Sequence, residues 1–290
     1  MGAAAGRGHG RPTAAAHARR RRGAAAGRRD AGRGHRRMMR AAATAIRFLT
    51  RLPVPGGAET SETFAQEIRR ALWLFPLVGA GIGAATALAL WLADLALPFA
   101  LAVLVALAIE ARLTGALHED ALADLCDGLG GGRTPEDVLR ILKDSRIGAF
   151  GALGLGSGVA LRAGGLMAMP DPAQAMIVLV VSGALGRLLM LAVMAAVPPV
   201  PGREGLGASV ASSADWKGLG IAALLAAPVL LLGAFADARA MVVACILGVV
   251  FLFWYRGLLR RRIGGSTGDA IGAAAYVGIV LATLAFAMER

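Results

Sequence analysis

The chain has 290 residues, of which 57% are hydrophobic, 5% are aromatic and 17% are charged. Its mean hydropathy of +0.62 is far from the average of soluble globular proteins and indicates membrane helices, in which small residues allow close packing. The net charge of +12 is unevenly distributed, because eleven arginines and one aspartate lie in residues 1–37. The basic balance therefore belongs mainly to one segment and does not indicate a nucleic-acid-binding fold.

The composition divides the chain into two regions. Residues 1–40 are rich in Ala, Gly and Arg and cannot build a core, so they are predicted to form a disordered basic tail. Met38 and Met39 are alternative start sites, and contact of the tail with anionic lipid is the functional alternative. Residues 41–290 are predicted to form a membrane-embedded domain. Its two cysteines are far apart in sequence and do not indicate a disulfide framework.

Apolar runs of about 20 residues predict an all-α fold, a polytopic helical bundle with about seven membrane-spanning helices. The second run is short and is compatible with a tilted or partly re-entrant segment. The longest polar insert lies over about 113–146. The predicted spans are 71–93, 97–112, 147–169, 174–197, 218–235, 240–258 and 270–288.

The basic residues of the connecting segments predict the orientation. Lysines and arginines gather in alternate segments, whereas the opposite segments hold only Arg239 and Arg290. This asymmetry predicts a cytoplasmic N-terminus, a C-terminus outside, and a multi-pass protein of the inner membrane with its site on the cytoplasmic side. The segments predicted to lie inside are 38–70, 113–146, 198–217 and 259–269.

Three aspartates form the most informative pattern of the chain. Asp120, Asp124 and Asp127 are spaced i, i+4 and i+7, so on a helix they lie on one face. Like charges on one face repel each other, and a divalent cation with a preference for oxygen ligands, such as Mg²⁺, relieves that repulsion. Glycines at 128 and 130–132 follow and allow backbone N–H groups to approach phosphate. The alternative is a solvated acidic helix face.

A second motif, LKDSRIG, directly precedes a predicted span. Lys143 and Arg146 are able to neutralise a diphosphate, and Asp144 either pairs with Arg146 or completes a metal site. Ordinary anchoring of basic residues at the cytoplasmic face is the alternative for the two bases.

A third motif, GGSTGDAIGA, opens the last predicted span. In it, Gly268 precedes Asp269, which is able to cap the helix or reach a ligand. Arg187 lies inside a predicted span, where a charge usually faces a polar cavity, and Arg162 is a weaker candidate of the same kind. Arg203 lies in a polar loop that either contacts a nucleotide or only connects two spans.

Together these motifs resemble one family, the adenosylcobinamide-GDP ribazoletransferases, also called cobalamin synthases. The resemblance covers about residues 42–288 and departs from the family pattern at Ala116 and Ala121, where Gly is usual, and at Glu119, where Leu is usual. Tyr276 and Ile279 stand where acidic residues often follow the last motif. The matching segments are FLTRLPVP, FPLVGAGIG, LTGALHEDALADLCDGLGG, LKDSRIGAFGAL, GR, REGLG and GGSTGDAIGA.

The resemblance implies that α-ribazole, or its 5′-phosphate, attacks the cobinamide-linked phosphorus of adenosylcobinamide-GDP and releases GMP. It implies a Mg²⁺ site on Asp120, Asp124 and Asp127, supported by Asp144 or Asp269, with His118 or one carboxylate accepting the hydroxyl proton. Other expected partners are the lipid bilayer, further enzymes of cobalamin assembly and a second copy of the chain, but not nucleic acid. Residues expected to bind substrate or phosphate are Arg51, Lys143, Arg146, Arg187, Arg203, Gly268 and Asp269.

Two other classes of protein remain as alternatives. A CDP-alcohol phosphotransferase also uses spaced aspartates on membrane helices, but its signature contains an Ala-Arg pair that does not follow Asp120. A transporter would distribute charges along several spans near the midplane of the membrane. Here the charges gather at one predicted face, which favours interfacial catalysis.

Overall fold

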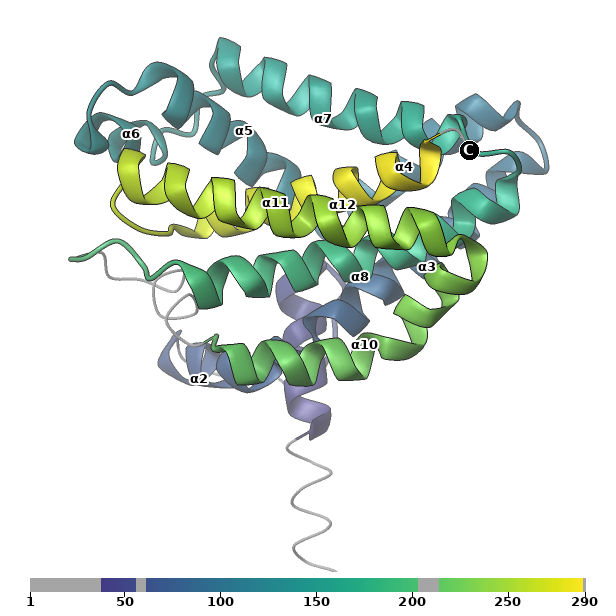
Figure 1. Ribbon diagram of the computed structural model, residues 1–290, viewed down its shortest axis with the longest axis horizontal. Coiled ribbons are helices and arrows are strands. Elements are labelled where there is room, and N and C mark those ends of the chain that lie inside the picture. Colours follow the sequence, from purple (N-terminus) through teal and green to yellow (C-terminus); the bar gives the residue numbers. More distant parts are fainter. Residues whose placement is uncertain (1–37, 56–60, 203–213, 289–290) are drawn as a thin grey trace, which may run out of the picture. The chain divides into compact units, whose positions relative to one another are not determined.

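The computed structural model describes residues 38–55, 61–202 and 214–288 (Figure 1). Contacts divide the chain into two units, residues 1–40 and residues 41–290. Residues 1–37, which include nearly all of the predicted tail, lie outside the described residues.

The described residues are helical, and their only β-structure is one isolated bridge between Pro199 and Ser266. The all-α prediction is therefore confirmed. A first helix runs over residues 38–49. The others are α2 (Ser61–Ala71), a 3₁₀ turn η1 (Leu72–Leu74), α3 (Phe75–Asp94), α4 (Phe99–Thr114), α5 (Leu117–Gly131), α6 (Pro135–Ile141), α7 (Ala149–Met167), α8 (Pro172–Ala196), α10 (Trp216–Ala236), α11 (Ala238–Arg262) and α12 (Gly268–Ala287).

Six helical segments of the described chain are long and apolar enough to cross a membrane. They correspond to six of the seven predicted spans, and the first of them, Gln66–Asp94, includes part of α2, η1 and all of α3. The remaining predicted span, 97–112, forms α4, which qualifies only together with α5 after a bend of 88°. The number of spans is therefore six, or seven if the bent pair counts as one. The polar insert after it is largely helical, because it contains α5 and α6.

Aspartate side chains define where three of the long helices begin. Asp171 accepts a hydrogen bond from the amide of Gln174 (2.8 Å), and Asp215 accepts one from Gly218 (2.6 Å). Asp237 does the same for α11. An N-cap of this kind satisfies an amide that has no partner inside the helix. These acids have local structural roles and are not candidates for the site.

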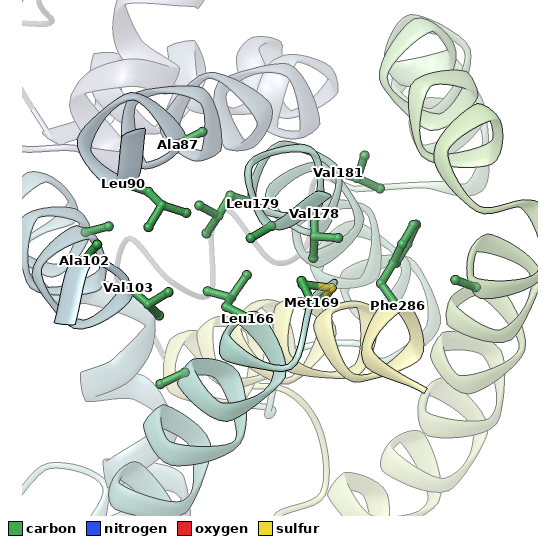
Figure 2. Close-up of a cluster of buried hydrophobic side chains, with 14 of the residues drawn as sticks. Ala87, Leu90, Ala102, Val103, Leu166, Met169, Val178, Leu179, Val181 and Phe286 are labelled. Atoms are coloured by element: carbon green, nitrogen blue, oxygen red, sulfur yellow. The ribbon is translucent and has the colours of Figure 1, made fainter. Parts of the chain in front are cut away.

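The helices α8 and α12 lie at the centre of the unit. In their most apolar windows, 67% and 78% of the residues are buried, against 17% in α10 and α11. Accordingly, α12 contacts α5, α7, α8 and α11 (Figure 1). Figure 2 shows one apolar cluster, in which Leu90 of α3, Val103 of α4, Leu166 of α7, Leu179 of α8 and Phe286 of α12 meet. The low burial of α10 and α11 is what lipid-facing helices require.

Glycines allow α3 and α8 to cross with their backbones in contact. A Cβ atom at Gly79 would overlap the carbonyl oxygen of Gly183, and one at Gly83 would overlap that of Leu179. Small residues spaced by four are a common device for close packing of membrane helices. The glycines of the FPLVGAGIG segment therefore allow the close packing of α3 against α8.

Candidate functional site

The three spaced aspartates lie on one helix, α5, and differ in exposure. Asp120 is exposed, Asp124 is half-buried and Asp127 is buried. Asp269, in the first turn of α12, is close enough to add to the repulsion that Asp120 and Asp127 exert on Asp124. The two helices approach closely here because position 272 is glycine, where a Cβ atom would lie 2.7 Å from that of Ala121. The fold thus brings a carboxylate of α12 to the acidic face of α5.

Asp127 differs from the other two because it caps α7. Its two carboxylate oxygens accept hydrogen bonds from the amides of Gly148 (2.6 Å) and Gly151 (2.7 Å). A Cβ atom at Gly148 would lie 2.5 Å from one oxygen, and one at Gly151 would overlap the other. Both glycines of the LKDSRIGAFG motif are therefore needed for the carboxylate to reach the amides. The structure gives Asp127 a clear architectural role that its spacing alone does not indicate.

Replacing Asp127 by alanine is expected to lower the free energy of unfolding by about 1–3 kcal/mol, because two amides at the start of α7 lose their acceptors. The measurement is the midpoint of thermal unfolding in detergent. Asp127→Asn keeps one acceptor oxygen and is expected to lose less. Equal midpoints for wild type and Asp127→Ala would contradict the capping role.

The loop before α7 holds an exposed ion pair. The guanidinium of Arg146 donates to both oxygens of Asp144, with a shortest distance of 2.7 Å. This hydrogen bonding lowers the pKa of Asp144 to about 2, so the pair stays charged at any physiological pH. Of the two alternatives for Asp144, the structure shows the pair with Arg146. Lys143 and Arg146 are exposed beside the capped end of α7 and are accessible to a ligand.

In the GGSTGDAIGA motif, Ser266 and Thr267 make the hydrogen bonds that hold the start of α12. The cap of α12 is Thr267, whose hydroxyl accepts from the amide of Ala270 (3.2 Å), so of the two roles open to Asp269 the cap is wrong, and contact with a ligand stays a prediction. Ser266 donates to the carbonyl of Val197 (3.0 Å) and joins this loop to the end of α8. Gly268 is exposed and Asp269 is half-buried. The aspartate side chain is thus not needed for the cap.

His118 and Arg187 are enclosed among the helices and do not join the aspartates. His118 has an exposed fraction of 5%, and neither of its ring nitrogens has a hydrogen-bond partner. It is two residues from Asp120, which places the two side chains on opposite faces of α5. Arg187 of α8 is 2% exposed, and its charge acts on His118. The candidate residues therefore form two groups, an acidic face and an interior polar cluster.

The interior cluster includes a glutamate that belongs to none of the predicted motifs. Glu110 of α4 accepts from Arg162 of α7 and from Thr86 of α3, both across 2.8 Å. The sequence did contain a signal, since Glu110 is the only charged residue in the apolar run 95–111, and an ionisable residue inside such a run is a functional candidate. Arg162, the weaker of the two intramembrane arginines by sequence, is its partner.

Two further predicted residues are Arg51, at the junction of α4 and α5, and Arg203, outside the described chain. Arg51 is exposed, its amide donates to the carbonyl of Leu113 (2.8 Å), and its side chain lies directly on Gly115. Arg51 thus contacts the junction between α4 and α5. Arg203 lies in 203–213, outside the described residues.

Within the described ranges, no three histidine, cysteine, aspartate or glutamate side chains converge as a preformed metal site. Mg²⁺ does not need such a site, because it usually retains waters and binds one or two carboxylates together with substrate phosphates. Asp120, Asp124 and Asp269 supply oxygen donors with mutual repulsion that a cation would relieve. The donor set therefore fits a cation that arrives with a diphosphate.

The apolar helices and this carboxylate face define a polytopic helical membrane protein with an acidic site. A family model described as cobalamin-5-phosphate synthase matches residues 41–287. The chain therefore belongs to the cobalamin-5-phosphate synthase family, as the motifs predicted.

Curated relatives agree with the family match. A protein of Leptothrix cholodnii named adenosylcobinamide-GDP ribazoletransferase is 40% identical over 79% of this chain and 88% of its own length. Proteins of the same name from Bradyrhizobium diazoefficiens and Ralstonia nicotianae are 40% and 41% identical, over 85% and 80% of this chain and 94% and 89% of their own lengths. No solved structure matches the chain.

Proposed function

We propose that the chain is an adenosylcobinamide-GDP ribazoletransferase in the assembly of the cobalamin nucleotide loop. The observation that carries the proposal is the match to relatives of that name across nearly the whole membrane domain. A hydroxyl oxygen of α-ribazole, or of its 5′-phosphate, forms a bond to the cobinamide-linked phosphorus of adenosylcobinamide-GDP. The bond from that phosphorus to GMP breaks, and the products are adenosylcobalamin, or its 5′-phosphate, and GMP.

The acidic face is the proposed reaction centre. Asp120 and Asp124, with Asp269 opposite them, would hold Mg²⁺, which supplies charge neutralisation for the diphosphate when bound. Asp127 keeps both oxygens on the amides of α7 and so holds the face in place. We assign acceptance of the hydroxyl proton to a carboxylate of this face, since His118 lies on the opposite side of α5.

Positive charge for the phosphates is proposed to come from the loop before α7. Lys143 and Arg146 are exposed there, and an arginine binds phosphate oxygens in a fork geometry. Arg187 is enclosed, so the proposal places it in the interior cluster and not in direct contact with phosphate. Arg51, Arg203 and Gly268 stay predicted substrate contacts.

The membrane orientation is also a proposal. The distribution of the basic residues supports a cytoplasmic N-terminus and a cytoplasmic acidic face in a protein of the inner membrane. This placement requires α4 and α5 together to form one span, which puts the C-terminus outside; without that span, the C-terminus lies inside and the acidic face lies on the outer side. Association with other enzymes of cobalamin assembly, or with a second copy of the chain, is proposed on functional grounds alone.

The test of the function is release of GMP by the purified protein in lipid, supplied with adenosylcobinamide-GDP, α-ribazole and Mg²⁺. Release is expected to require α-ribazole, to fall to background when a chelator is added, and to return with excess Mg²⁺. Metal-independent release would contradict the Mg²⁺ assignment. The absence of release from folded protein with either ribazole substrate would contradict the function itself.

A further inference from the structure

A buried ion pair joins α4 to α7 inside the apolar part of the bundle. The distance from Arg162 Nη2 to Glu110 Oε2 is 2.8 Å, and the side chains are 3% and 4% exposed. Burying two charges is so costly that apolar residues of similar volume often replace such a pair without loss of stability. Stability alone therefore does not explain why the pair is present.

The pair lies close to the elbow between α4 and α5. Glu110 is in the last turns of α4, and the elbow itself is made by Gly115 and Ala116, which both have positive φ (71° and 55°). A left-handed alanine is strained and persists only where surrounding contacts enforce it. Arg162 and Thr86 supply such contacts by holding Glu110 from α7 and α3.

The far end of α5 is also attached to α7, through Asp127 and the amides of Gly148 and Gly151. The α4–α5 segment is thus attached to α7 on both sides of the acidic face. Asp120 and Asp124 lie between the two attachments, and Asp269 approaches them from α12.

We infer that Glu110 and Arg162 are positioning residues, which hold the elbow and thereby keep Asp120 and Asp124 opposite Asp269. This inference rests on the proposed function for its catalytic consequence. Neither residue contacts the acidic face directly. Their influence passes through the elbow and the helix that follows it.

The surroundings of the pair make its loss severe. The charges of Glu119 and Arg187 act on Arg162 and Glu110, respectively, so they also belong to the cluster. Within the described chain, the Nε atoms of both arginines and both ring nitrogens of His118 are buried without a partner. In the interior cluster, hydrogen-bond donors already outnumber acceptors. Removal of the Glu110 charge therefore leaves the guanidinium groups of Arg162 and Arg187 poorly compensated, and α4 and α7 are expected to separate locally.

Cys126 gives a readout of this separation that does not depend on activity. Its sulfur lies against α7 at Gly154, where a Cβ atom would overlap it. The only other cysteine, Cys245, is exposed on α11. For the experiment it is replaced by serine, and this Cys245→Ser protein is the parent of all the variants below. Cys126 is half-buried, and separation of α5 from α7 is expected to raise the rate at which a membrane-permeant maleimide labels it. Labelling is measured in lipid without metal or substrate.

Glu110→Gln is expected to raise the labelling rate of Cys126 roughly fivefold or more, because one lost buried charge contact favours the open state by at least that factor. The Mg²⁺ concentration for half-maximal GMP release is expected to rise by a similar factor. Exchange of the two charges in Glu110→Arg with Arg162→Glu is expected to restore part of the slow labelling. Asp137→Asn, which breaks the exposed Asp137–Arg140 pair on α6, is the control and leaves both readouts unchanged.

The double variant Glu110→Met with Arg162→Met separates position from stability. It removes both buried charges, so it is expected to insert and fold even if the single variant does not. Rapid labelling of Cys126 in this folded protein supports the inference. The inference is overturned if Cys126 is labelled at the parent rate in both Glu110→Gln and the double variant. If only the double variant folds, labelling at the parent rate in that variant alone overturns it. If the parent releases no GMP, the proposed function fails, whereas the labelling rates still decide whether the pair positions α5.

Discussion

Asp124→Asn is expected to lower the rate of GMP release on the order of a thousandfold while the protein inserts and folds normally, because it removes charge from the centre of the acidic face. Asp124 is half-buried, and the carboxylates of Asp120, Asp127 and Asp269 surround it, so it contributes to any cation held there. Asparagine has nearly the same shape and keeps one oxygen. The loss therefore reports charge rather than packing.

The measurement is the initial rate of GMP release in lipid at saturating Mg²⁺ and substrates. Asp137→Asn is a matched control, since it makes the same chemical change at an exposed aspartate of α6. The control is expected to keep full activity. Near-wild-type turnover of Asp124→Asn would remove Asp124 from the reaction and, with it, the assignment of the site to this face of α5.

Gly79→Val is expected to destabilise the protein by about 3 kcal/mol or more, or to prevent folding, because the new side chain meets backbone atoms that have no room to move. The carbonyl of Gly183 lies where the Cβ atom would be, and the Cδ atom of Arg187 lies 2.8 Å from it. Separation of α3 from α8 would also disturb the interior cluster.

The same substitution two residues later gives the control. Gly81 is on the same helix and has open space where a Cβ atom would be. Gly81→Val is therefore expected to change the free energy of unfolding by about 0.5 kcal/mol or less, in the stabilising direction, because valine has a higher helix propensity than glycine. Thermal unfolding in detergent measures both variants. Equal midpoints for the two would show that the α3–α8 crossing tolerates bulk and that its glycines are not required for packing.

The membrane helices were predictable because each is a long apolar run, and such runs have few alternative structures in lipid. The elbow was not predictable in the same way. Polar residues begin at position 112 and resemble a loop, yet Leu122 and Leu125 of α5 are buried while Asp120 is exposed. The bend depends on left-handed backbone at Gly115 and Ala116, and alanine carries no local signal for that conformation.

Sequence spacing predicted that the three aspartates share a helix, but it did not distinguish their surroundings. Asp127 became a cap because the tertiary fold brings two amides of α7 to it, a contact across more than 20 residues. His118 is adjacent to the acidic motif in sequence, yet helix geometry directs it to Arg187. Glu110 was missed because it belongs to no motif, although its apolar neighbours indicated it.

The contact between Asp127 and the start of α7 has a consequence for how this sequence is able to change over evolution. A side chain at position 148 or 151 displaces the carboxylate of Asp127. Once position 127 has lost its carboxylate, positions 148 and 151 no longer need to be glycine for that contact. A mutation at any one of the three positions is therefore penalised until the others adjust. Covariation across two separate motifs is the expected trace of one hydrogen-bonded contact.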